Sequence, residues 1–127
     1  MNADRPLHAA ITITLLLTAL VFFLLSGLFI LVPMAGAHVY GLKAHTASAL
    51  FYIRAIGLRD LALACYILGL TVVKQRRALS ILLALTTVIP AGDLLLLELA
   101  GTGAVLNYVL HVMSLIVFAL LAFWVRP

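Results

Sequence analysis

The sequence is poor in charged residues. Lys and Arg together number 8, Asp and Glu number 4, and charged residues make up 9% of the 127 positions, against 66% that are hydrophobic. A soluble domain of this size buries only about two-thirds of the surface that its unfolded chain exposes, which is too little to hide so much apolar surface. The composition therefore predicts an integral membrane protein.

Cysteine is almost absent as well. Cys65 stands alone in an apolar run, which excludes an intramolecular disulfide and a cysteine-rich metal site. The sequence has no glycine-rich phosphate loop, and its net charge of +4 comes from a few basic residues outside the apolar runs and a few within them. We interpret this charge as a signal that orients the chain in the membrane and not as a nucleic-acid-binding surface. We expect no nucleic-acid partner, no cofactor and no metal.

The apolar residues form long, continuous runs. A transmembrane β-barrel requires alternating segments of about ten residues, whereas a spanning helix requires roughly 20 consecutive apolar residues. Runs of the second kind cover about 8–32, 47–73, 78–100 and 104–125, and 33–46 reads as a loop because of Pro33 and two glycines. The predicted fold class is all-α, a four-helix transmembrane bundle that forms a single domain over residues 1–127.

Basic residues outside the spans predict the orientation. With four spans, the two termini share one side with the connection between the second and third spans. That side has five basic residues and the other has one (Arg5, Lys74, Arg76, Arg77 and Arg126 against Lys43). By the positive-inside rule this multi-pass protein is expected to have both termini in the cytoplasm.

Ionisable residues also occur inside the spans. The second span contains Arg54, Arg59 and Asp60, although each ionised group at membrane depth costs at least ~2.5–3.5 kcal/mol. Counted at ~1.5 Å per residue, these residues lie in the same half of the membrane as Asp93 of the third span and His111 of the fourth. We therefore expect a polar pocket that opens outward and is walled by the second, third and fourth spans.

The ionisable residues need partners of opposite charge. Arg59 and Asp60 point about 100° apart on a helix, so they are expected not to face each other. Each is expected to pair across helices, and Arg59 with Asp93 is the predicted pair. Two interpretations stay open: the ion pairs fix the helix bundle, or the polar residues form a functional site, as intramembrane ionisable residues commonly do.

These residues carry a family resemblance. The pattern F-x-x-R-x-x-G-L-R-D-L-A-L at 51–63, I-P-A-G-D at 89–93 and a histidine early in the fourth span resembles a family of small four-helix membrane proteins catalogued as a domain of unknown function. In outline the sequence is similar to DoxX-like membrane proteins. The resemblance covers the chain from about Val32 onward. It implies the fold, supplies no activity and singles out seven positions (Arg54, Gly57, Arg59, Asp60, Pro90, Asp93 and His111).

Two carboxylates and an arginine in a dry pocket can perform acid–base chemistry on a lipophilic small molecule. An analogy based only on the set of residues is available from a soluble hydrolase family of another fold, in which two aspartates and an arginine open epoxides. On that analogy Asp93 is the base, Asp60 the acid and Arg59 the positioning residue, with His111 or Asn107 holding water. The predicted function is a membrane-bound hydrolase, such as an epoxide hydrolase, or an isomerase or cyclase. The expected substrate-binding residues are Arg54, Asn107, Tyr52 and Glu98.

Two other functions stay open. The pocket would also serve a non-enzymatic membrane subunit that binds a lipophilic ligand or acts as a scaffold. Proton-coupled transport is the weaker alternative, because the inner half of the spans offers no polar residue to continue a path and no inverted repeat is visible. The sequence leaves a homodimer open.

Overall fold

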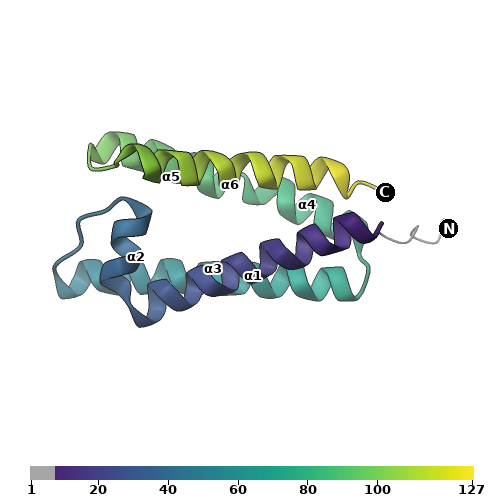
Figure 1. Cartoon of the computed structure of the whole chain (residues 1–127), viewed down its shortest axis with the longest axis horizontal. Helices are drawn as coiled ribbons and strands as arrows, with labels where there is room; N and C mark the ends of the chain where they lie inside the picture. Colours follow the sequence, from purple (N-terminus) through teal and green to yellow (C-terminus); the bar gives the residue numbers. More distant parts are fainter. Residues whose placement is uncertain (1–7) are drawn as a thin grey trace.

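The computed structural model describes residues 8–127, which form six α-helices and no strand (Figure 1). The helices are α1 (Ala9–Leu31), α2 (Pro33–Tyr40), α3 (Ala47–Val72), α4 (Arg76–Thr86), α5 (Val88–Ala100) and α6 (Val105–Trp124). Four stretches are long and apolar enough to cross a membrane: α1, α3, α6 and the consecutive pair α4–α5. The predicted all-α, multi-pass membrane protein is confirmed. The four-helix description is approximate, because four spans are made of five helices and α2 is an additional one.

The spans are arranged in two layers. α1 packs along α3 in one layer, and α6 packs against α4 and α5 in the other (Figure 1). The start of α1 and the C-terminus lie at one end of the bundle, which we call the terminal end, and α2 lies at the other. Arg5, on which the predicted orientation partly rests, lies outside the described residues, and the side of the membrane that each end faces stays a prediction.

Gly57 sets the distance between α1 and α3. A Cβ atom at this position would lie 2.8 Å from Ile30 Cγ1 and 2.9 Å from Phe29 Cβ, closer than real Cβ contacts occur. The missing side chain thus lets the two backbones approach, as small residues do at helix interfaces in membranes.

The third span, which was predicted as one helix over 78–100, is interrupted. α4 ends at Thr86 and α5 begins at Val88. The cause is Pro90, which has no N–H to bond the Thr86 carbonyl four residues earlier. The hydroxyls of Thr86 and Thr87 donate back to the carbonyls of Leu82 and Ala84, at 2.7 and 2.6 Å.

The connection expected as a loop over 33–46 contains the helix α2, so that expectation is wrong. Pro33 occupies the first turn, where the absent N–H has no helical partner to lose. Gly41 ends the helix with φ 103°, a left-handed conformation that glycine adopts without steric cost. The proline and glycine that suggested a loop are the start and stop of a short helix.

Alanine substitutions at two glycines of α3 test the packing of α1 on α3. Gly57→Ala should destabilise the protein by about 1–3 kcal/mol, the usual cost of overpacking. Gly69→Ala is the matched control, because a Cβ there meets nothing within 4 Å and alanine has the higher helix propensity. Thermal unfolding of the purified protein in detergent measures both. Equal melting temperatures for the two variants would contradict the close approach at Gly57.

Candidate functional site

α2 is held across one end of the bundle by side chains of α6 and the turn before it. The last carbonyls of a helix have no partner within the helix, and here Thr102, Asn107 and His111 supply donors to four consecutive ones. Asn107 Nδ2 donates to His38 and Val39 at 3.0 and 2.9 Å, His111 Nε2 to Tyr40 at 3.1 Å, and Thr102 Oγ1 to Gly41 at 2.9 Å. These bonds join α2 of one layer to α6 of the other.

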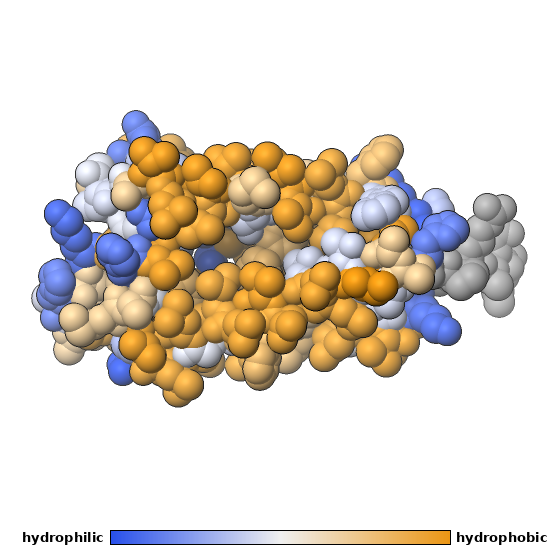
Figure 2. Space-filling view, in the orientation of Figure 1, coloured by the Kyte–Doolittle hydropathy of each residue, from blue (hydrophilic) through white to orange (hydrophobic). Residues whose placement is uncertain are grey.

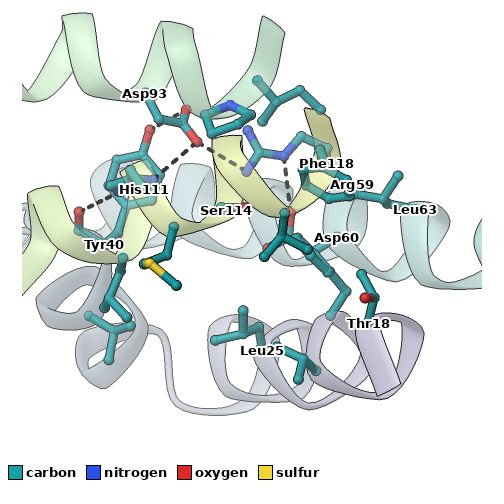
Figure 3. Close-up of a pocket in the computed structure, with 18 of the residues that line it drawn as sticks. Thr18, Leu25, Tyr40, Arg59, Asp60, Leu63, Asp93, His111, Ser114 and Phe118 are labelled. Carbon is teal, nitrogen blue, oxygen red and sulfur yellow. Dashed lines mark hydrogen bonds and ion pairs between the residues drawn. The ribbon is translucent and has the colours of Figure 1, made fainter. Parts of the chain in front are cut away.

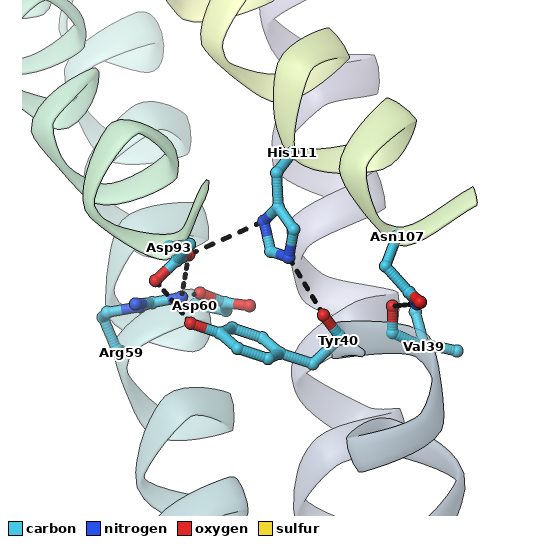
Figure 4. A network of polar contacts seen from close by, with 7 residues as sticks. All are labelled: Val39, Tyr40, Arg59, Asp60, Asp93, Asn107 and His111. Atoms are coloured by element: carbon cyan, nitrogen blue, oxygen red, sulfur yellow. Dashed lines mark hydrogen bonds and ion pairs between the residues drawn. The ribbon is translucent and has the colours of Figure 1, made fainter. Parts of the chain in front are cut away.

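The docked α2 brings Tyr40 to a cluster of ionisable side chains (Figure 4). We define the polar cluster as Tyr40, Arg59, Asp60, Asp93 and His111. The Tyr40 hydroxyl donates to Asp93 Oδ1 at 2.6 Å. The other oxygen of Asp93, Oδ2, lies 3.7 Å from Arg59 Nη2 and 3.7 Å from His111 Nδ1. Arg59 Nε donates to Asp60 Oδ1 at 3.2 Å. Residues of α2, α3, α5 and α6 thus meet at one point.

Arg59 pairs with both carboxylates. The predicted ion pair with Asp93 is confirmed, but the expectation that Arg59 and Asp60 do not face each other is wrong. The 100° separation applies to the Cβ directions, and the long arginine side chain bends back far enough for Nε to reach the neighbouring carboxylate. Arg59 therefore bridges its own helix and the opposite layer.

The cluster is largely withdrawn from its surroundings. The side chains of Asp60, Asp93 and His111 are 5%, 10% and 13% exposed, and that of Arg59 is 35% exposed. Charges in such a setting are retained only when they are paired and hydrogen-bonded. Two carboxylates face one permanent cation, with a histidine beside them. Carboxylates and histidines are the side chains that most often perform general acid–base chemistry.

Tyr40 is a member of the site that was not predicted from the sequence. Its ring packs edge-on against His111 with centroids 4.9 Å apart, and only 6% of the residue is exposed. Burial and the hydrogen bond to Asp93 raise the pKa of the Tyr40 hydroxyl above its ordinary value. The available signal was the spacing of Pro33 and Gly41, which predicts a short helix with Tyr40 as its last residue.

A cavity of about 510 Å³ adjoins the cluster (Figure 3). It lies between two apolar cores, one at the terminal end and one at the α2 end, and takes lining residues from both: Leu63 and Phe118 from the first, Phe29 and Tyr40 from the second. Arg59, Asp60, Asp93 and His111 all line it, as the predicted pocket required. Most of the remaining lining residues are apolar.

The walls and the opening differ from the expectation. α1 supplies a complete wall, from Thr14 to Phe29, in addition to the three spans that were predicted. This wall was not predicted because α1 has no ionisable residue that would mark it in the sequence. The α2 end, through which the pocket was expected to open, is crossed by α2, and the hollow is visible instead on the lateral face between α1 and α6 (Figure 2).

One oxygen of the cluster is open to the cavity. Within residues 8–127, no hydrogen bond or ion pair engages Asp60 Oδ2, and no buried side-chain nitrogen or oxygen lacks a partner. This oxygen is therefore exposed at the cavity wall. The Ser114 hydroxyl, which also lines the cavity, is open for the same reason. A bound molecule would meet these two groups beside Arg59.

The expected substrate-binding residues lie elsewhere. Arg54 is exposed and donates to the Ile30 carbonyl at 3.3 Å, and Tyr52 is 68% exposed. Glu98 is exposed and accepts a hydrogen bond from Tyr108 at 3.1 Å. These three residues do not line the cavity, and Asn107 holds α2. Among residues 8–127, no group of three or more His, Cys, Asp and Glu side chains could hold a metal.

Fold and site together define a multi-pass helical membrane protein with an ion-paired polar cluster beside an apolar cavity. The chain belongs to the DUF4267 family, described as a domain of unknown function, whose sequence profile matches residues 19–125. That range contains the entire polar cluster and confirms the predicted family of unknown function, while the likeness to DoxX proteins stays a prediction. No curated protein and no solved structure matches the sequence.

The raised pKa of Tyr40 predicts an alkaline loss of stability. An unfolded tyrosine ionises near its ordinary pKa of 10.0, whereas folded Tyr40 keeps its proton. The contribution of the Tyr40 hydroxyl to the free energy of unfolding is therefore complete below pH 10.0. It is lost as the pH rises further, at up to about 1.4 kcal/mol per pH unit. Melting temperatures between pH 8 and pH 11 should fall less steeply for Tyr40→Phe than for the wild type.

A second tyrosine provides the control for that experiment. Tyr52→Phe, at an exposed position, should keep the wild-type pH profile. If the wild type and Tyr40→Phe lose stability in parallel, the hydroxyl does not hold its proton in the way described.

Proposed function

We propose that the protein is an intramembrane enzyme that acts on a lipophilic small molecule by acid–base chemistry at the polar cluster. The reaction class is hydrolysis, with an epoxide as the leading example, or isomerisation or cyclisation. The observation that carries the proposal is the Asp60 carboxylate: one oxygen is held by Arg59 at 3.2 Å, and the other is open to an apolar cavity.

The geometry favours a different division of roles from the one drawn by analogy. Both oxygens of Asp93 are occupied, one by Tyr40 and the other near Arg59 and His111. Asp60 is thus the carboxylate that a substrate would reach. In the proposed mechanism Asp60 takes a proton from water or from the substrate. The Asp93–His111 pair holds the proton that is returned to the substrate oxygen or carbon.

Arg59 and Tyr40 act as positioning residues in this mechanism. Arg59 holds the two carboxylates in fixed positions through its ion pairs with Asp60 and Asp93. Tyr40 fixes Asp93 through the 2.6 Å hydrogen bond. A preorganised arrangement of this kind reduces the cost of orienting groups during the reaction.

A non-enzymatic binder is the second candidate. It is favoured by the fact that Asp93 has protein partners for both oxygens, as in a purely structural ion-pair network. Proton-coupled transport has less support. The core at the terminal end is built from apolar side chains such as Leu15, Ile67 and Leu79, each fully buried. This apolar core offers a proton no path from the polar cluster to the terminal end.

The test compares lipophilic extracts of cells that express the wild type, Asp60→Asn or Glu98→Gln. General acid–base catalysis contributes about 10²–10⁴-fold to a rate, so Asp60→Asn should abolish the mass or retention shift of one metabolite that the wild type produces. Glu98→Gln makes the same chemical change outside the cavity and should behave as the wild type. All three proteins must first be shown to reach the membrane in equal amount.

The outcomes separate the two candidate functions. A metabolite that shifts with the wild type and Glu98→Gln, but not with Asp60→Asn, supports the enzyme and identifies its substrate. Identical extracts from all three strains, together with a compound that co-purifies unchanged with the wild type, would make the pocket a binding site and contradict the acid–base proposal.

A further inference from the structure

We infer that the cavity takes an uncharged, elongated lipophilic molecule with a single oxygen-containing head group, that this molecule enters sideways from the bilayer between α1 and α6, and that the cavity rejects carboxylates. The inference rests on the proposed function only in that both treat the cavity as a ligand site. Three features of the structure support it.

The first feature is the distribution of polar groups along the cavity. They gather on the side formed by α2, α3 and α5, with His111 and Ser114 from α6 (Figure 3). On the α1 wall, the hydroxyls of Thr14 and Thr18 donate to backbone carbonyls of their own helix at 2.8 Å. That wall therefore offers a ligand no free donor. A molecule that fits has one polar end and an apolar body.

The second feature is the entrance. α1 packs against α3, and α6 packs against α4 and α5, but α1 and α6 have little contact with each other. Four residues both line the cavity and are 44–57% exposed, which places them at its mouth: Leu17 and Val21 of α1, and Leu110 and Met113 of α6. All four are apolar, and the surface around the hollow is hydrophobic (Figure 2). The mouth therefore faces lipid, while α2 covers the adjacent end.

The third feature is the charge balance of the cluster. His111 Nε2 lies 3.1 Å from the Tyr40 carbonyl, which can only accept a hydrogen bond, so Nε2 carries a hydrogen. His111 Nδ1 faces Asp93 Oδ2 at 3.7 Å. Without a proton between them, the lone pair of Nδ1 would face the negatively charged carboxylate and the two would repel each other. We therefore place one proton on the Asp93–His111 pair. Arg59, Asp60, Asp93 and His111 then sum to zero charge.

A cluster that is already neutral has no counter-charge for an ionic head group. Arg59, which a carboxylate would need, is engaged by Asp60 and Asp93. A ligand carboxylate would add a negative charge beside Asp60 in a poorly solvated site, where like charges repel each other strongly. A hydroxyl brings no such repulsion, and it can donate to the open oxygen of Asp60 and accept from the Ser114 hydroxyl. An ether, epoxide or carbonyl oxygen brings no such repulsion either and can accept from Ser114.

The experiment measures binding of three 14-carbon probes that differ only in the head group: tetradecanol, tetradecanoic acid and tetradecylamine. Native mass spectrometry of the full-length protein released from detergent reports the bound fraction at each probe concentration. The alcohol should bind at least about tenfold more tightly than the acid, and more tightly than the amine. Equal or tighter binding of the acid or of the amine would overturn the inference.

Variants then locate the binding and its selectivity. Ser114→Phe places a large side chain in the cavity and should abolish alcohol binding, whereas Val109→Phe, on the same helix but outside the cavity, should not. Asp60→Asn removes one negative charge and should raise the affinity for tetradecanoic acid about tenfold. If Ser114→Phe still binds the alcohol, or if Asp60→Asn leaves the discrimination unchanged, the assigned site is wrong.

The binding experiment and the test of the proposed function can give opposite outcomes. Head-group selectivity without any change in cell extracts would support the inference and leave the protein a binder. Turnover of a carboxylate substrate would support an enzyme and overturn the inference.

Discussion

A guanidinium placed inside a bilayer has to be paired, and the ion pairs of Arg59 determine much of this structure. Asp60 binds it from the same helix and Asp93 from the opposite layer. Removing one partner of a buried ion pair leaves a charge without compensation, at a typical cost of 3–5 kcal/mol. The cross-layer contact therefore ties α3 to α5 at the point where the cavity separates the layers. The same contact places two carboxylates at the cavity wall.

Two local features of the backbone fix the partner on α5. Pro90, three residues before Asp93, causes the interruption of the third span at Thr87, and α2 brings the Tyr40 hydroxyl to one oxygen of that carboxylate. The short helix α2 is itself held by side chains of α6 and its preceding turn that bond its last carbonyls. Asn107 thus serves the site indirectly, because it holds the helix that carries Tyr40. The result is a polar cluster in which Tyr40, Arg59, Asp93 and His111 each make at least two contacts, while Asp60 is held by Arg59.

The sequence predicted the spans, the Arg59–Asp93 pair and a pocket that includes Asp60 and His111, but not the contact between Arg59 and Asp60. Ionisable residues stand out in apolar runs, and the fixed rise of a helix gives their depth. Depth does not give the direction around the helix axis, so Arg54 and Glu98, at suitable depths, were grouped with residues that they do not meet. α2 was missed because proline and glycine mark helix ends as well as loops. The α1 wall was missed because α1 has no ionisable residue that would mark it in the sequence.

The central claim is that Arg59 and Asp93 form one energetic unit across the two layers. A double-mutant cycle with Arg59→Met and Asp93→Asn, followed by thermal unfolding in detergent, tests it most directly. The account predicts that the double variant is more stable than the sum of the two single losses implies, because removing both partners leaves less buried charge unpaired. Additive losses would show that the two residues do not depend on each other and would contradict the account.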